Sequence, residues 1–253
     1  MDKTSSPKNK SSKKPSFKTK TARFHAKFLA SYYGHPLRDM KLICLTGTSG
    51  KATAAHFVHE ILRAAGQHVA ILASDSPIKV STLHKFFSEA WKAGSNYCVV
   101  TAPAESLKND VFYGLPIHIA ALTDFIPASL DAPSVEDFLS SESTLFEMSP
   151  EIVVLNEDDA HFPDFSKYTG KSATLTYGTT RSSTLRIDSA KLYKKGTEAN
   201  LSLGSSRFTT ASFLTGEPIV SYMACAAAIA TALHISTDII SEGIANYNPD
   251  HIS

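Results

Sequence analysis

Cysteine is scarce in this 253-residue chain, and its few cysteines show no metal-ligand spacing. Cys44, Cys98 and Cys225 stand apart, each among apolar residues. This usage predicts buried thiols in a reduced, cytoplasmic protein, and it excludes a disulfide framework. Long apolar runs are missing too. The most apolar stretch, 223–233, is far shorter than the roughly 20 residues that a membrane span needs, so we expect a buried Ala-rich helix there.

Several catalytic signatures are also absent. The histidines are scattered, with only His56 and His59 close together on a predicted helix, and no H-E-x-x-H pattern occurs. No serine or cysteine stands in a pattern that pairs a nucleophile with a base. The sequence therefore gives no support for a hydrolase, and it contains no internal repeat.

Charge is distributed unevenly along the chain. Residues 1–20 hold seven lysines against Asp2, a net charge of +6, whereas the whole chain is only +1, which leaves −5 for the rest. With almost no apolar residues, this segment cannot offset its ordering entropy, so we predict a disordered basic tail over 1–22. No apolar segment follows the lysines, so a secretory signal is not expected. The tail is either a solvated segment without a specific partner, which composition favours, or an arm for nucleic acid, anionic lipid or an acidic partner.

Apolar runs of strand length alternate with helical periodicity through the first two thirds of the chain. This alternation predicts an α/β fold with a doubly wound, mostly parallel sheet and helices on both faces. The predicted strands are 41–45, 68–73, 97–101, 117–123 and 152–155, and the predicted helices are 24–33, 51–65, 82–93 and 135–147.

The pattern changes after Gly170. Short runs rich in Thr and Ser, separated by glycines, predict a small antiparallel β meander, and two helices follow. The predicted strands are 173–177, 184–192, 199–203 and 207–213, and the helices are 222–233 and 237–247.

One glycine-containing turn joins a predicted strand to a predicted helix. Backbone N–H groups in such a turn, together with a helix N-terminus, form a cradle for phosphate oxygens. The spacing here is G-x-x-G-K, shorter than the usual P-loop pattern, and an ordinary turn with a surface lysine is the alternative. The position between strand and helix favours phosphate binding. The candidate residues are Gly47, Thr48, Ser49, Gly50, Lys51, Ala52 and Thr53.

The segment LTGTSGKATAAHFVHEIL resembles the phosphate loop and following helix of the Mur ligase superfamily. The closest branch is the one that adds the third residue of the peptidoglycan stem peptide. IVVLNEDDAHF is similar to the N-x-D-D-P segment of that branch, and GEPIVSYMACAAAIATALHI to its Ala-rich helix. The resemblance implies that 23–253 form the ATP-binding middle domain, with Asn156 and Asp159 also at the nucleotide.

The departures from the family pattern fall at positions that the resemblance links to magnesium. Ala52 stands in place of the hydroxyl residue after the loop lysine, and Thr101 in place of a glutamate at a strand end. Ala128 and Ser129 replace an Asp-His pair, and Glu142 aligns with a lysine that the family carbamylates.

Two interpretations follow from these departures. In one, the carboxylates of Asp124, Glu105, Asp131 and Glu142 take over the metal, since magnesium needs only one or two carboxylates beside phosphates and water. In the other, metal chemistry is lost while nucleotide binding survives, and four changes at metal-related positions favour this second interpretation. Magnesium is therefore a doubtful cofactor, whereas ATP is expected.

The resemblance also implies flanking domains, one for a UDP-sugar and one for the amino acid, which we expect this chain to lack. The leading hypothesis is a degenerate or partial Mur-ligase-like protein related to peptidoglycan precursor synthesis. The first alternative is an active ATP-dependent acid–amino acid ligase subunit that works with a separate chain. The second is a nucleotide-dependent binding module recruited through its basic tail.

Overall fold

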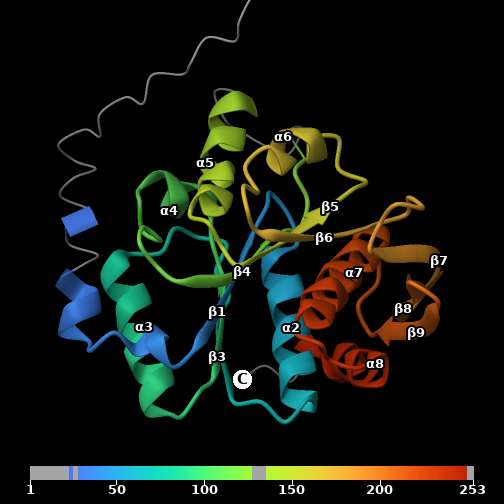
Figure 1. The fold of residues 1–253 in the computed structure, drawn as a ribbon. Helices are drawn as coiled ribbons and strands as arrows, with labels where there is room; N and C mark the ends of the chain where they lie inside the picture. The colour runs from blue at the N-terminus through green and yellow to red at the C-terminus, as the bar shows by residue number, and fades with distance from the viewer. Residues whose placement is uncertain (1–22, 25–27, 127–134, 250–253) are drawn as a thin grey trace, which may run out of the picture.

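A single nine-stranded sheet runs through the molecule in the order β2-β3-β1-β4-β5-β6-β7-β8-β9 (Figure 1). The computed structural model describes residues 23–24, 28–126 and 135–249, so the predicted tail (1–22), the Ala128–Ser129 pair and Asp131 lie outside the described residues. The strands are β1 (Lys41–Thr46), β2 (Val69–Leu72), β3 (Tyr97–Thr101), β4 (Ile117–Leu122), β5 (Ile152–Asn156), β6 (Ala173–Gly178), β7 (Leu185–Tyr193), β8 (Gly196–Leu203) and β9 (Ser206–Ser212).

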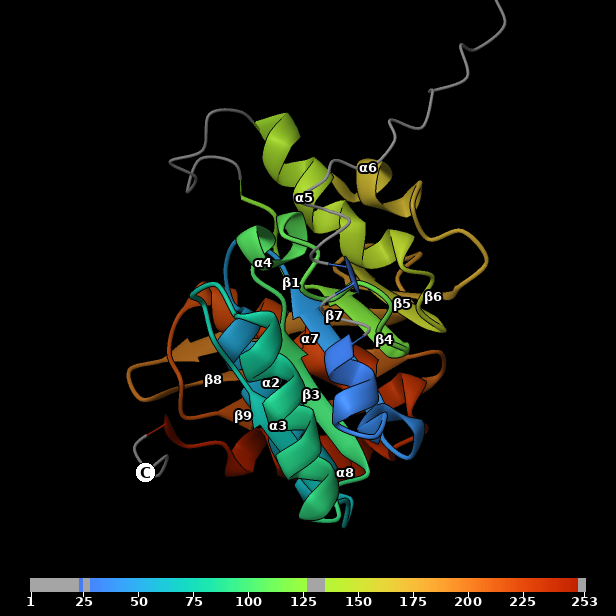
Figure 2. The same cartoon turned by 90° about the vertical axis from the view of Figure 1, so that its left-hand side faces the viewer.

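Helices cover both faces of the sheet, as predicted. Figure 1 shows α3, α4 and α5 on one side and α2, α7 and α8 on the other, and the view in Figure 2 places α3 across the front of β3. The helices are η1 (Pro36–Arg38), α2 (Lys51–Ala64), α3 (Val80–Lys92), α4 (Ala104–Lys108), α5 (Val135–Glu147), α6 (Phe162–Ser166), α7 (Glu217–Ala232) and α8 (Thr237–Asn246). Among the described residues, no helix is long and apolar enough to cross a membrane.

The strands at the centre are apolar on both sides because each side faces a separate core. Along β1, Ile43 and Leu45 pack in the core under α2, α7 and α8, whereas Leu42 and Cys44 pack in the core under α3, α4 and α5. All three cysteines are buried and free, as predicted. Burial raises the pKa of Cys98 and of Cys225 to about 12, so these thiols stay protonated and unreactive.

One strand differs from the sequence prediction. The run 173–177 was expected to open the antiparallel meander, but β6 pairs in parallel with β5 and extends the parallel sheet. Among the strands of the described residues, only the pairs β7–β8 and β8–β9 are antiparallel. The Thr-rich sequence of β6 is misleading because its first two residues are exposed, so the strand lacks the continuous apolar character of its parallel neighbours.

Glycine at one position allows two helices to pack closely. A Cβ atom added to Gly243 of α8 would lie 2.3 Å from the Cα atom of Ile61 in α2. The backbone of α2 occupies that space, so a side chain can be accommodated only if α8 moves away.

We predict that Gly243→Ala lowers the free energy of unfolding by about 1–3 kcal/mol, because overpacking outweighs the gain in helix propensity. Urea denaturation measures the change. The exposed neighbour Glu242 provides a control, since Glu242→Ala should stay within about 0.5 kcal/mol of the parent. Equal stability of the two variants would contradict the packing argument.

Candidate phosphate-binding site

The predicted loop lies between the end of β1 and the start of α2, and both of its glycines are required there. Gly47 has φ +136° and Gly50 has φ +74°, values that other residues rarely adopt. A Cβ atom on Gly47 would lie 2.4 Å from Oγ1 of Thr123 and 2.8 Å from the carbonyl oxygen of Asp124. The loop backbone therefore passes directly against the end of β4.

Hydrogen bonds fix the loop to that strand end. The Thr123 hydroxyl donates to the carbonyls of Ser49 (2.6 Å) and Thr46 (3.1 Å). The backbone N–H of Thr48 donates to the Asp124 carbonyl at 2.8 Å, and the Thr48 hydroxyl accepts from the backbone N–H of Ile126 at 2.8 Å. The loop is thus held in one shape before any ligand arrives.

The N-terminus of α2 is suited to an anion. Its N-cap, Gly50, offers no side chain to the first backbone N–H groups, and the first turn holds no acidic residue. These N–H groups have no acceptor within the helix, and the helix dipole adds partial positive charge at this end. Lys51 is the first helical residue, so a full positive charge stands at the same point.

Lys51 is held inward rather than extended into solvent. Its side chain is only 8% exposed, and Nζ donates to the Gly47 carbonyl at 2.8 Å. Nζ also lies 3.6 Å from a carboxylate oxygen of Asp75, a residue that is itself well exposed. A phosphate at the loop would therefore meet an ammonium group that is already positioned, with Asp75 free to move aside into solvent.

Tyr222 of α7 completes the wall of the loop. Its hydroxyl lies 2.8 Å from the Ser49 hydroxyl, and its ring fills the space where a Cβ atom on Gly50 would stand, 2.0 Å from ring carbon Cε1. In the sequence, Tyr222 is only the first residue of a predicted helix. No local signal identifies it, because the contact joins residues 173 positions apart.

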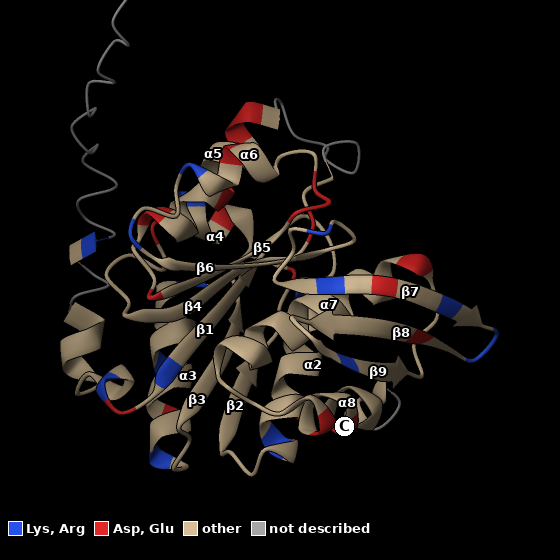
Figure 3. Ribbon diagram, turned by 45° about the vertical axis from the view of Figure 1, so that its right-hand side comes forward, with Lys and Arg blue, Asp and Glu red and all other residues tan. Residues whose placement is uncertain are grey.

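Beside the loop lies an open cleft of about 410 Å³, where the ends of β4 and β5 face the start of α7. Asn156, Asp158 and Asp159 line this cleft, together with Asp124. Figure 3 shows the acidic residues of the loop after β5 close to the N-terminal end of α7. Asn156 and Asp159, which the resemblance places at the nucleotide, thus lie in one cleft beside the loop of residues 47–53.

These polar groups differ in what they bind within the protein. Asn156 donates to Oδ1 of Asp124 at 3.0 Å, and the Ser221 hydroxyl donates to the same oxygen at 3.2 Å. Burial raises the pKa of Asp124, and these two hydrogen bonds lower it in part. Asp159 accepts from the backbone N–H groups of Phe125 and His161. Asp159 therefore shapes the rim of the cleft, while Asn156 orients Asp124.

The positions linked to magnesium do not fit a metal site built by the protein. Ala52 offers no ligand atom. Thr101 is fully buried, and its hydroxyl accepts from the backbone N–H of Ser74 and donates to the Ser74 carbonyl, both at 2.7 Å. Glu105 lies exposed in the first turn of α4. Within the part of the chain that the structure describes, no three His, Cys, Asp or Glu residues gather closely enough to hold a metal.

Glu142 is a buried carboxyl group next to the loop. Its side chain is fully buried in α5, and neither oxygen makes a hydrogen bond of normal geometry with any described residue, the Gly47 N–H lying near but not well aligned. Burial raises its pKa to about 8, although the nearby Lys51 ammonium and Gly47 backbone N–H favour the ionised form. Burial therefore favours the neutral form of the carboxyl group that stands behind Lys51.

Comparisons with known proteins agree with this geometry. A profile of the Mur ligase middle domain matches residues 45–230. A UDP-N-acetylmuramoyl-L-alanyl-D-glutamate–2,6-diaminopimelate ligase of Bacillus licheniformis is 29% identical over 238 residues, which cover 85% of this chain and 48% of the relative. A relative of the same name from Clostridium tetani is 30% identical over 183 residues, 67% of this chain and 37% of its own length.

Solved structures show the same fold. A structure of a UDP-N-acetylmuramoyl-L-alanyl-D-glutamate–2,6-diaminopimelate ligase superposes with a TM-score of 0.81 at 18% identity, covering 91% of this chain and 50% of that one. MurF ligase from Thermotoga maritima, solved with ADP, gives a TM-score of 0.68 at 18% identity, covering 91% of this chain and 52% of that one. The chain spans about half the length of the relatives it matches, and it belongs to the Mur ligase middle-domain family.

Proposed function

We propose that this protein binds ATP or ADP through the loop of residues 47–53 and acts in peptidoglycan precursor metabolism as a degenerate or partial Mur ligase. The observation that carries the nucleotide proposal is the uncapped N-terminus of α2, where Lys51 is already held against the loop. The matched relatives are named as ligases of UDP-N-acetylmuramoyl peptides, and the structural neighbour that holds ADP supports the choice of nucleotide.

The proposal that the protein is degenerate rests on positions 52 and 101, where the family's metal-binding side chains are missing. Ala52 has no oxygen, and the Thr101 hydroxyl is engaged by the Ser74 backbone inside the protein. A bound metal supplies several kcal/mol of transition-state stabilisation in phosphoryl chemistry. Backbone N–H groups and one lysine hold a nucleotide without it, so binding survives where turnover does not.

The alternative of an active ligase subunit differs in a measurable way. It requires that Asp124 or Glu142 recruit the metal together with the nucleotide phosphates. Magnesium-dependent ATP turnover, alone or with a second chain, would support that alternative against our proposal.

Lys51→Ala is the first test. Charge-assisted hydrogen bonds contribute about 1.5–3 kcal/mol, so we expect the variant to bind ATP and ADP roughly 10- to 100-fold more weakly. Isothermal calorimetry measures both affinities. Lys92→Ala, at an exposed lysine in the last turn of α3, is the matched control and should bind as the parent does. Absence of binding by the parent at millimolar nucleotide would refute the proposal.

The second test concerns magnesium. We expect nucleotide affinity to change little between magnesium and EDTA, and ATP hydrolysis to stay at background. Ala52→Thr returns a hydroxyl at a half-exposed position and should introduce a magnesium dependence. Thr101→Glu is a poorer variant, because it removes the hydrogen bonds to Ser74 from a fully buried site. Strong magnesium dependence in the parent would show that its own carboxylates bind the metal.

The third test uses the titration of Glu142. The folded protein holds this proton up to a pKa of about 8, whereas an ordinary glutamate releases it near 4.5. Between those values the folded state binds more protons, so rising pH removes stability, by at most about 1.4 kcal/mol per pH unit.

Glu142→Gln keeps the shape of the protonated acid but cannot ionise. In EDTA and without nucleotide, we expect the two proteins to unfold alike near pH 4, below the ordinary glutamate pKa, and the variant to be the more stable one at pH 8. Urea denaturation at each pH follows the difference. A parallel pH dependence in both proteins would mean that Glu142 is already ionised in the folded state.

A further inference from the structure

The segment between β2 and α3 brings a carboxylate to the phosphate-binding loop. Asp75 lies in this segment, and one of its carboxylate oxygens is 3.6 Å from Nζ of Lys51. The side chain of Lys51 is only 8% exposed, whereas that of Asp75 is 73% exposed. A nearly buried cation of the candidate site is thus paired with an anion at the surface.

Hydrogen bonds on both sides of Asp75 hold its backbone in place. Before it, the backbone N–H of Ser74 donates to the hydroxyl of Thr101, at the end of β3, at 2.7 Å. After it, the backbone N–H of Ile78 donates to the hydroxyl of Ser106, in α4, at 2.8 Å. Because the chain is attached at both points, the fold itself places the carboxylate beside the loop.

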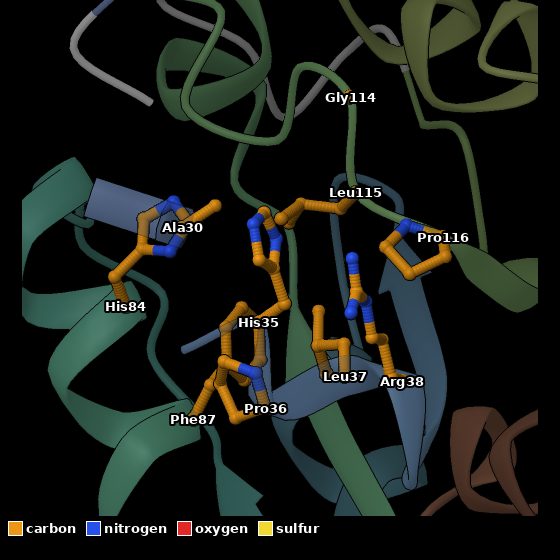
Figure 4. Close-up of a pocket in the computed structure, with 10 residues that line it drawn as sticks. All are labelled: Ala30, His35, Pro36, Leu37, Arg38, His84, Phe87, Gly114, Leu115 and Pro116. Atoms are coloured by element: carbon orange, nitrogen blue, oxygen red, sulfur yellow. The ribbon is translucent and has the colours of Figure 1, made fainter. Parts of the chain in front are cut away.

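The helix that follows this segment is anchored as well. Phe87 of α3 lines a small cavity of about 90 Å³ together with Pro36 of η1 and Leu115 (Figure 4). Phe87 is fully buried, so α3 cannot shift without exposing apolar surface. A ligand can therefore displace the carboxylate by turning one exposed side chain, while both flanking elements stay in place.

Phosphate can replace this ion pair. The separation of 3.6 Å exceeds the length of a charge-assisted hydrogen bond, whereas phosphate oxygens approach an ammonium group to about 2.8 Å. A phosphate at the loop also accepts from the first backbone N–H groups of α2. We propose that Asp75 is a built-in competitor of phosphate, which occupies Lys51 in the nucleotide-free protein and lowers the affinity of the site. This inference rests on the proposed nucleotide binding.

Two effects of the carboxylate oppose the ligand. While Asp75 is paired with Lys51, the site is not competent, and the apparent affinity falls with the fraction of competent molecules. After displacement, the carboxylate stays close to the phosphates and repels them. Because an ion pair with one exposed partner is only modestly stable, we expect the combined loss of affinity to be about 3- to 10-fold.

Asp75→Asn tests the inference, because the amide keeps the shape of the side chain and removes its charge. In EDTA, isothermal calorimetry should show ADP and ATP binding about 3- to 10-fold more tightly to the variant than to the parent. Asp75→Glu keeps the charge and should bind nearly as the parent does. In a Lys51→Ala background, Asp75→Asn should have a smaller effect, since the carboxylate has then lost its partner.

Glu89→Gln is the matched control. It removes an ion pair of the same length, 3.6 Å, between the exposed side chains of Lys85 and Glu89 in α3, and it should leave nucleotide affinity unchanged. Thermal unfolding shows whether each variant is folded. Equal affinities of the parent and Asp75→Asn would overturn the inference and leave the proposed nucleotide binding intact. Failure of both proteins to bind millimolar nucleotide would overturn both proposals. Weaker binding by Asp75→Asn in magnesium would also contradict the inference, since the carboxylate would then act as a metal ligand.

Discussion

The hydroxyl group of Thr123 is the contact on which the candidate site depends. It bonds to the carbonyls of Thr46 and Ser49, one at the end of β1 and the other inside the loop. The position of Thr123 is set in turn by Tyr177, whose buried hydroxyl donates to the carbonyls of Leu122 and Thr123. Three neighbouring segments of the sheet therefore determine the shape of one glycine loop. The parallel arrangement makes this possible, because the carboxyl ends of β1 and β4 meet at the same edge.

Electrostatics around Lys51 follow from that fixed backbone. The ammonium group is held against Gly47, with exposed Asp75 on one side and buried Glu142 nearby. An ionised Glu142 would neutralise the lysine and oppose an incoming phosphate. Burial raises the pKa of the carboxyl group and so favours its neutral form, which leaves the positive charge available to the proposed ligand. Burial of an acid thus serves anion binding, although the same acid at the surface would oppose it.

Much of the fold could be predicted from sequence periodicity. Strands β1, β3 and β4 are continuous apolar runs buried on both faces, so their existence and parallel pairing follow directly. The parallel pairing of β6 could not be predicted in this way, because the strand is partly exposed and rich in threonine. The short helices α4, α6 and η1 were not predicted, since three to five residues are too few to show a helical period.

The residues of the candidate site could likewise be predicted only in part. The loop glycines and Lys51 could be found because a phosphate cradle is local in sequence. Tyr222 could not, because its contact with Ser49 joins segments far apart in the chain. Thr101 was interpreted as a lost ligand, and the structure adds that its hydroxyl joins the end of β3 to Ser74, after the end of β2.

The open sheet also has two outer strands, β2 and β9, and each leaves one row of backbone groups unpaired by the sheet. Such rows can recruit a strand from another molecule and start aggregation. β2 is only four residues long, and β9 consists mainly of Ser, Thr and Arg, with the N-terminal part of the sequence SRFTTAS exposed. Because β2 is short and β9 is polar, neither is a good template for pairing with a strand of another molecule. A wide sheet can thus exist in a small domain without joining its copies edge to edge.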